Sequence, residues 1–76
     1  MITSTMTGQT NICLTDRETE VLGLVAQGLS SKEAARRLAV SKRTIDFHLA
    51  NTYEKLNVSN RIQAFRTASS LGLILL

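Results

Sequence analysis

The sequence predicts an all-α fold, a four-helix bundle that contains a helix-turn-helix, and three observations support this prediction. Helix start signals occur at residues 15–18 (TDRE) and 30–33 (SSKE), where a hydroxyl residue precedes a glutamate by three positions. Between residues 33 and 56, two helix-forming segments are joined by only a few residues. The chain has no proline, and 43% of its residues are hydrophobic. Its length of 76 residues allows one small domain.

The first and fourth predicted helices flank the helix-turn-helix. The first spans about residues 16–26 and the fourth about residues 61–71. Each is followed within two residues by a glycine, which is the usual residue at the left-handed end of a helix. The fourth helix has two candidate caps, Ser59 and Asn60, and the second of these would form a third capping box with Gln63.

The second and third predicted helices form the helix-turn-helix. The second runs from its cap Ser30 to near Leu38, and the third spans residues 42–56 after its cap Ser41. We expect small or branched residues where these helices cross, at Ala35, Ala39 and Ile45. At about 100° per residue, one side of the third helix gathers residues that we expect to face the core, namely Ile45, Leu49, Thr52, Tyr53 and Leu56.

The charge distribution favours a nucleic-acid partner. The net charge is +3, but residues 14–28 carry one arginine against three acids, and residues 32–43 carry five basic residues against one glutamate. A basic cluster beside a helix-turn-helix is typical of a surface that binds phosphates. The alternative is an ordinary solvated helix face, and the helix-turn-helix spacing favours DNA over it.

Composition argues against several other classes of protein. With one cysteine and one histidine, the chain offers no internal disulfide and no zinc site, and no cofactor is expected. His48 has no nucleophile or carboxylate at a catalytic spacing; it borders the predicted core, so we expect no enzyme. No positive charge precedes Arg17, and the apolar run 73–76 is too short to span a membrane. We therefore expect a cytoplasmic protein without membrane contact.

From residue 14 to residue 73 the chain resembles the DNA-binding domain of the LuxR/FixJ (GerE-like) family of bacterial transcription regulators. The resemblance rests on the segments LTDRETEVLGLVAQGLSSKEAARRL, VSKRTIDFH, KLNVSNRIQA and LGL. It implies a four-helix domain whose third helix enters the major groove of double-stranded DNA. It also implies that the fourth helix pairs two copies on a two-fold symmetric site. The domain would then occupy residues 14–76, after a flexible arm formed by residues 1–13.

Hydroxyl and basic side chains supply the candidate phosphate contacts, because both bind phosphate oxygens. These candidates are Lys32, Ser41, Lys42, Arg43, Thr44, Lys55 and Arg61. The family has a threonine that matches Thr44. Arg36 and Arg37 are expected to contribute to the general field instead.

Five residues on or near the open side of the third helix are the candidate base readers. They are Arg43, Asp46, Phe47, Ala50 and Asn51. A carboxylate can accept from cytosine N4, and an apolar side chain can contact the thymine methyl, so we expect these roles for Asp46 and Phe47. Relatives often carry a basic residue in place of Asp46. The alternatives are that Asp46 is a first-turn acid favoured by the helix dipole, and that Phe47 packs on its neighbours.

Self-association is predicted on the fourth helix, through Arg61, Ile62, Phe65 and Ser69. The apolar tail 73–76 is the second candidate contact surface. Cys13 is expected to be an inert thiol; a redox-controlled disulfide between two chains is the alternative.

Together these observations predict a regulator that binds palindromic promoter sites as a homodimer. Because a short arm alone precedes the domain and the chain begins with Met, we expect it to act without a sensory domain. RNA polymerase is a further partner expected of a protein bound at a promoter. One alternative is a protein-interaction module in which Asp46 and Glu54 have weakened DNA binding. The other is the C-terminal fragment of a larger response regulator.

Overall fold

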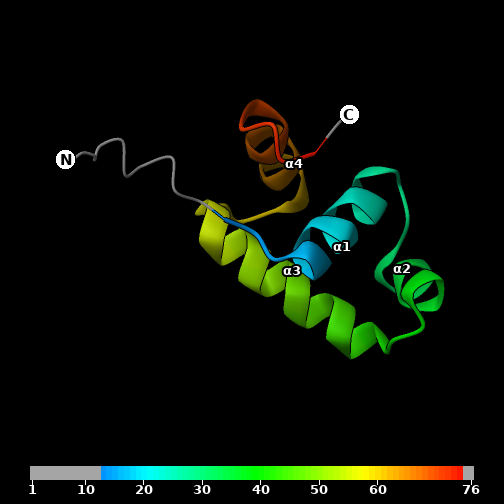
Figure 1. Ribbon diagram of the computed structural model, residues 1–76. Coiled ribbons are helices and arrows are strands. Elements are labelled where there is room, and N and C mark those ends of the chain that lie inside the picture. The colour runs from blue at the N-terminus through cyan, green and yellow to red at the C-terminus, as the bar shows by residue number, and fades with distance from the viewer. Residues whose placement is uncertain (1–12, 75–76) are drawn as a thin grey trace.

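The computed structural model describes residues 13–74 and contains four α-helices and no strand in that range (Figure 1). The helices are α1 (Asp16–Ala26), α2 (Ser31–Leu38), α3 (Lys42–Leu56) and α4 (Arg61–Ser70). The all-α prediction is confirmed, and each helix begins and ends within about a residue of its predicted bounds. Of the predicted N-terminal arm, all but Cys13 lies outside the described residues. No helix among residues 13–74 is long and apolar enough to cross a membrane.

The predicted capping residues begin all four helices. The capping boxes predicted for α1 and α2 are both present. In each, the cap side chain accepts from the N–H of the glutamate three positions later, and the glutamate side chain accepts from the N–H of the cap. Ser41 caps α3, and Asn60 caps α4 by accepting from the Gln63 N–H at 2.9 Å. The Gln63 side chain accepts from the N–H of Ser59 instead of Asn60, at 2.9 Å. The third box is therefore displaced by one residue, since the Asn60 N–H is not its donor.

Each helix is followed within two residues by a residue with left-handed backbone, namely Gly28, Ala39, Asn57 or Gly72. In each case the residue after it donates to a carbonyl five positions back, as Val40 does to Ala35 at 3.0 Å. Our prediction that Ala39 lies in the helix crossing is wrong. Ala39 has φ 59° and is exposed, because it ends α2 and turns the chain toward α3.

Replacing Ala39 by glycine is expected to stabilise the domain. A left-handed conformation costs an L-residue roughly 1–2 kcal/mol, and the greater unfolded entropy of glycine offsets part of this. The net gain should be about 0.5–1 kcal/mol in a denaturant titration. Ala50→Gly is the matched control, because Ala50 is also exposed but lies inside α3, where glycine costs about 1 kcal/mol. Destabilisation by both changes would contradict the assignment.

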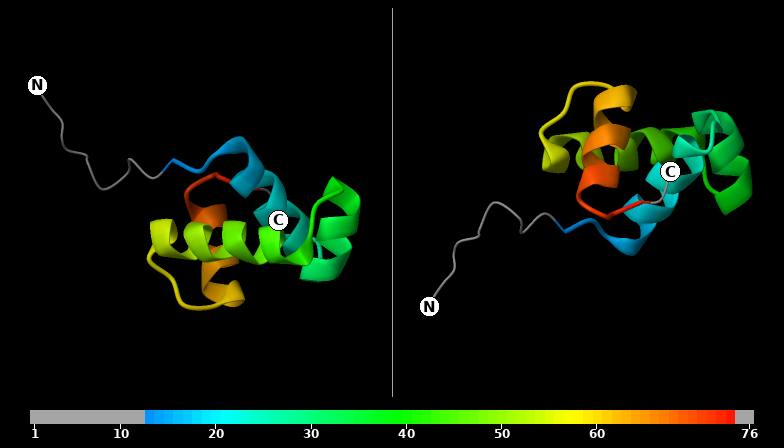
Figure 2. Two further views of the ribbon diagram at one scale, coloured as in Figure 1. Left: turned by 90° about the horizontal axis from the view of Figure 1, so that it is seen from below. Right: turned by 90° about the horizontal axis from the view of Figure 1, so that it is seen from above.

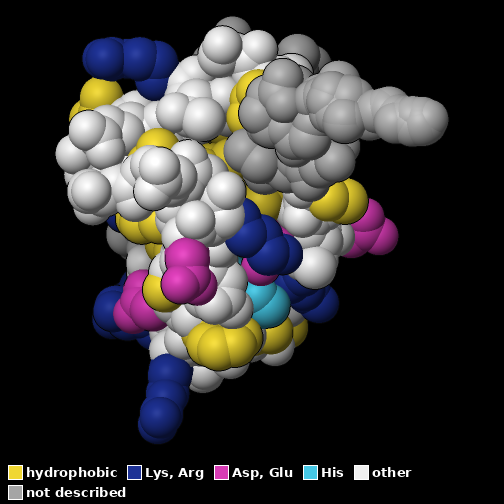
Figure 3. Space-filling view, turned by 90° about the vertical axis from the view of Figure 1, so that its left-hand side faces the viewer, with side chains coloured by type: hydrophobic (Ala, Val, Ile, Leu, Met, Phe, Trp, Pro, Cys, Tyr) yellow, Lys and Arg dark blue, Asp and Glu magenta, His cyan; other side chains and the backbone are white. Residues whose placement is uncertain are grey.

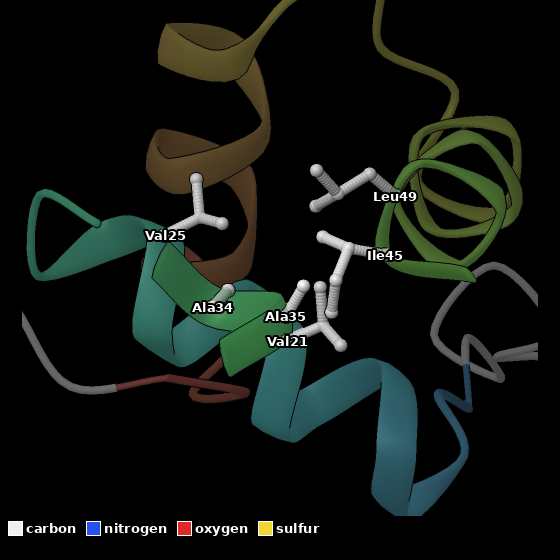
Figure 4. Packing of buried hydrophobic residues seen from close by; sticks show 6 residues of the cluster. All are labelled: Val21, Val25, Ala34, Ala35, Ile45 and Leu49. Carbon is white, nitrogen blue, oxygen red and sulfur yellow. The ribbon is translucent and has the colours of Figure 1, made fainter. Parts of the chain in front are cut away.

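The core consists of two clusters of buried residues. The first joins α1, α2 and α3 through Val21, Val25, Ala34, Ala35, Ile45 and Leu49 (Figure 4). The second joins α1, α3, α4 and the C-terminal segment through Leu22, Leu56, Ala64, Ala68 and Ile74. Alanines supply two of the six residues in the first cluster, which lets α2 approach α3 closely. α1 and α3 contribute to both clusters, so these two helices join the two halves of the core.

The C-terminal segment packs into the second cluster. Ile74 is only 8% exposed, and Leu73 is half-buried against the same residues. The prediction that the tail is a contact surface is therefore wrong for Ile74, whose apolar area is covered by its own domain, and Leu73 stays partly exposed. Residues 75–76 lie outside the described range.

A buried carboxylate links the start of α1 to the end of α3. Glu18 is 4% exposed, and its Oε1 accepts from the Thr15 N–H at 2.9 Å and from Lys55 Nζ at 2.7 Å. Burial by itself would raise the pKa of Glu18, but the hydrogen bonds from Lys55 and Thr15 outweigh it, so the pKa is lowered. The carboxylate therefore stabilises the folded state wherever it is ionised.

Acid is expected to destabilise the domain partly through Glu18. Because its folded pKa is lowered, its contribution is present above the unfolded pKa of about 4.3 and is lost as the pH falls through the folded pKa. Glu18→Gln should lower the free energy of unfolding at pH 7 by about 1–2 kcal/mol, and less at pH 3. Urea titrations at both pH values test this. The control is Glu20→Gln, an exposed glutamate of α1, which should change little at pH 7. An equal loss at both pH values for Glu18→Gln would contradict the prediction.

Candidate nucleic-acid interface

The side of α3 that faces away from the core is open. Viewed from below the orientation of Figure 1, α3 lies in front of the other helices (Figure 2, left). Arg43, Phe47 and Ala50 are exposed on this side, and Asn51 is half-buried. Four of the five residues predicted to face the core are buried, and the fifth, Tyr53, is half-buried and packs against both clusters. The structure thus separates the residues of α3 as the helical periodicity predicts.

An exposed aromatic side chain lies near the middle of this open side. Phe47 is 61% exposed, and its ring meets the ring of His48 edge to face, with centroids 5.7 Å apart. His48 is half-buried at the border of the core, as expected. Phe47 thus packs on its neighbour His48 with part of its ring, and most of its side chain is available to a ligand.

The basic residues at the start of α2 and α3 are exposed. Lys32, Lys42 and Arg43 are all on the surface. α2 packs against α3 in the first core cluster, so these basic residues lie on two neighbouring helices. On the face shown in Figure 3, basic side chains and some acidic ones project around a hydrophobic patch beside the histidine. This arrangement suits contact with phosphates on either side of an apolar reading surface.

Hydroxyl groups order the entry into α3. Ser41 Oγ accepts from the Thr44 N–H at 3.1 Å, and the two hydroxyl oxygens are hydrogen-bonded at 2.9 Å. Ser41 is exposed and Thr44 is half-buried. The cap thus satisfies one N–H of the first turn, and the dipole of the helix favours an anion at this end.

Asp46 and Lys42 form an ion pair on the surface of α3. Lys42 Nζ lies 2.7 Å from Asp46 Oδ2. The pKa of Asp46 is lowered mainly by this hydrogen bond from Lys42 and, to a smaller extent, by the Ser31 hydroxyl. The side chain is therefore a carboxylate at neutral pH. The alternative of a first-turn acid is wrong, since the first turn of α3 contains no acidic residue. A carboxylate at this position can accept a hydrogen bond, as the predicted contact with cytosine requires.

Lys55 has a partner within the domain. Its ammonium group is held by the buried Glu18, and its side chain is 39% exposed. A phosphate would have to compete with this bond, so Lys55 is better explained as the link between α1 and α3. Glu18 and Lys55 are 37 residues apart, and no spacing rule in the sequence connects them.

α4 presents a mixed outer surface. Arg61 and Ser69 are exposed, and Ile62 is 63% exposed. Phe65 is half-buried and packs against both core clusters, so only part of its ring is free for a second copy. At the opposite end of the chain, the Cys13 thiol is free and exposed.

The pattern that sequence reasoning missed on α3 was detectable. Lys42 and Asp46 are separated by four residues, which is the spacing at which oppositely charged side chains meet on a helix. They were predicted to have separate roles, as a phosphate contact and a base reader. The structure shows them as one pair.

Comparison with known proteins decides the family. The profile described as "Bacterial regulatory proteins, luxR family" matches residues 13–68, which is most of the chain. The chain belongs to the luxR family. The family is one of DNA-binding transcription regulators, so this luxR-type domain is a DNA-binding domain of that class.

Individual relatives agree with this assignment. The transcriptional activator protein AnoR of Acinetobacter nosocomialis is 47% identical over 87% of our chain, which spans only 28% of AnoR. The solved structure of the transcription factor GerE superposes with a TM-score of 0.78 at 37% identity, covering 82% of our chain and 92% of GerE. The response regulator ChrA of a heme-sensing two-component system gives 0.78 at 40% identity, covering 82% of our chain and 31% of ChrA. The luxR-type domain is thus found both in small and in larger proteins.

Proposed function

We propose that this domain binds specific DNA sequences by placing α3 in the major groove. The observation that carries the proposal is the open side of α3, where Arg43, Phe47 and Ala50 are exposed above a fully packed inner side. Arg43, Asp46, Phe47, Ala50 and Asn51 are the proposed base contacts. The pairing of Asp46 with cytosine and Phe47 with thymine remains the specific hypothesis for each half-site.

The phosphate contacts are proposed at both ends of the open side. Lys32, Ser41, Lys42, Arg43 and Thr44 would hold the backbone near the start of α3, and Arg61 would do so from α4. Their exposure, or half-exposure for Thr44, supports these roles. Lys55 is left out of this proposed set because Glu18 already binds it.

Two copies are proposed to bind together through α4. The exposed Ile62, with Arg61 and Ser69, offers a small contact surface, and Phe65 adds the exposed part of its ring. Two recognition helices that enter successive major grooves lie about 34 Å apart, so the site should be an imperfect palindrome. A small surface of this kind favours weak pairing that DNA strengthens.

DNA binding is proposed for this domain acting alone. The similarity to GerE, of which the matched region covers 92%, supports function by a domain of this size. The similarity to part of ChrA supports the alternative, in which such a domain belongs to a larger response regulator. Contact with RNA polymerase at the promoter is the further partner proposed. The protein-interaction alternative loses support at Ile74, which is packed into the second core cluster.

Selection from a pool of random duplexes in about 100 mM salt tests the proposal. The chain is expected to enrich a palindromic motif, and an Arg43→Ala/Asn51→Ala variant should lose the enrichment, because both residues lie on the reading side of α3. The control is Arg17→Ala, an exposed cation on α1, which should enrich the same motif. Salt-sensitive binding without any enriched motif would contradict sequence-specific binding.

A further inference from the structure

The open side of α3 carries an acid that is already bound to a neighbouring cation. Asp46 Oδ2 lies 2.7 Å from Lys42 Nζ, one helical turn earlier. The Lys42 side chain is 62% exposed and that of Asp46 is 49% exposed, so the pair lies in solvent. Both residues belong to the surface that we propose turns toward DNA.

This pair restricts what Lys42 can do. An ammonium group held by a carboxylate must leave or share that bond before it contacts a phosphate. If Lys42 leaves, the Asp46 carboxylate then faces the DNA polyanion without its cation, which is unfavourable. Exposed ion pairs are weak, so the pair can open, but opening adds to the free energy of every complex that uses Lys42.

The cation next to Lys42 in the sequence is not restrained in this way. Arg43 takes part in none of the ion pairs formed among residues 13–74, so it is free to bind DNA. Lys42, Arg43 and Asp46 together carry a charge of +1 at the start of α3, and without the acid they would carry +2. Asp46 therefore halves the positive charge of this segment.

We propose that Asp46 lowers the affinity of this surface for DNA of arbitrary sequence by holding Lys42 in the ion pair. The inference rests on the proposed function, since it concerns the same side of α3. The restraint is relieved at a site where a cytosine N4–H group donates to the Asp46 carboxylate and Lys42 turns to a phosphate. Asp46 then contributes to specificity mainly by weakening the wrong complexes.

The test measures binding to a duplex pool of random sequence between about 50 and 200 mM salt. Asp46→Asn should bind about 3- to 10-fold more tightly than the wild type, and its dependence of log affinity on log salt should steepen by about 0.9, one further phosphate contact. The gain should be much smaller in a Lys42→Ala background. Against a duplex enriched by selection the gain should also be smaller, so the ratio of specific to non-specific affinity falls.

The matched control is Glu20→Gln. It also removes one negative charge and frees a cation, because Glu20 pairs with Arg17 at 3.7 Å, but both lie on α1. It should leave the affinity within about 2-fold, as expected for a screened distant charge. Helical circular dichroism verifies that each variant is folded.

Two results overturn the inference while leaving DNA binding intact. One is equal affinity of Asp46→Asn and wild type for random duplexes. The other is an equal gain with and without Lys42, which would mean that Asp46 acts by its charge alone. Absence of salt-dependent binding in the wild type and in every variant would overturn the proposed function itself.

Discussion

Changing Lys32, Lys42 and Arg43 together to alanine is expected to lower the affinity for DNA roughly 10²- to 10³-fold at about 0.1 M salt. All three side chains are exposed, and they lie in the first turns of α2 and α3. Each phosphate contact contributes about 0.9 to the slope of log affinity against log salt, so the slope should fall by about 2–3. Titrations of a labelled duplex that carries the motif enriched by selection, at four salt concentrations, measure both quantities.

A second triple variant controls for net charge. Arg17, Arg37 and Arg66 are exposed cations on α1, α2 and α4, so their replacement by alanine removes the same charge from other parts of the surface. The screening length at this salt is about 10 Å, and their effect should therefore be much smaller than that of the first triple. If both triples weakened binding equally, the start of α3 would not be the phosphate-binding surface.

Ile45→Ala is expected to remove a large part of the free energy of unfolding at 25 °C. Ile45 is completely buried at the contact of α1, α2 and α3, where its removal leaves a cavity (Figure 4). Such a truncation costs about 2–5 kcal/mol. A domain of this size has a total stability of only about 4–11 kcal/mol, because its core is small. Urea unfolding followed by circular dichroism measures the loss.

Ile62→Ala is the control for Ile45→Ala, because it makes the same substitution at an exposed position. Ile62 is 63% exposed on α4, so the same substitution should change the free energy of unfolding by at most about 0.5 kcal/mol. The milder Ile45→Val, expected to cost about 0.5–1.5 kcal/mol, keeps enough folded protein for binding measurements. Similar losses for Ile45→Ala and Ile62→Ala would contradict the core assignment.

The open side of α3 was predictable, because one helix has one period. Arg43, Phe47 and Ala50 are exposed as the helical periodicity requires, and Ile45 and Leu49 are buried. The engagement of Lys55 by Glu18 was not predictable, because it depends on how α1 crosses α3. The burial of Phe65 was not predictable either. The pattern of the fourth helix placed Phe65 on a surface open to a second copy, but the folded domain partly covers it.

By itself the sequence determined where the four helices begin and end. The caps at Thr15, Ser30, Ser41 and Asn60 act on N–H groups three positions later, so their effect is contained in a few residues. Only the tertiary structure decided which groups remain free for DNA. It placed Glu18 against Lys55 and Ile74 against the second core cluster. These contacts join segments far apart in the chain, and their strength depends on burial, which exists only once the helices have packed.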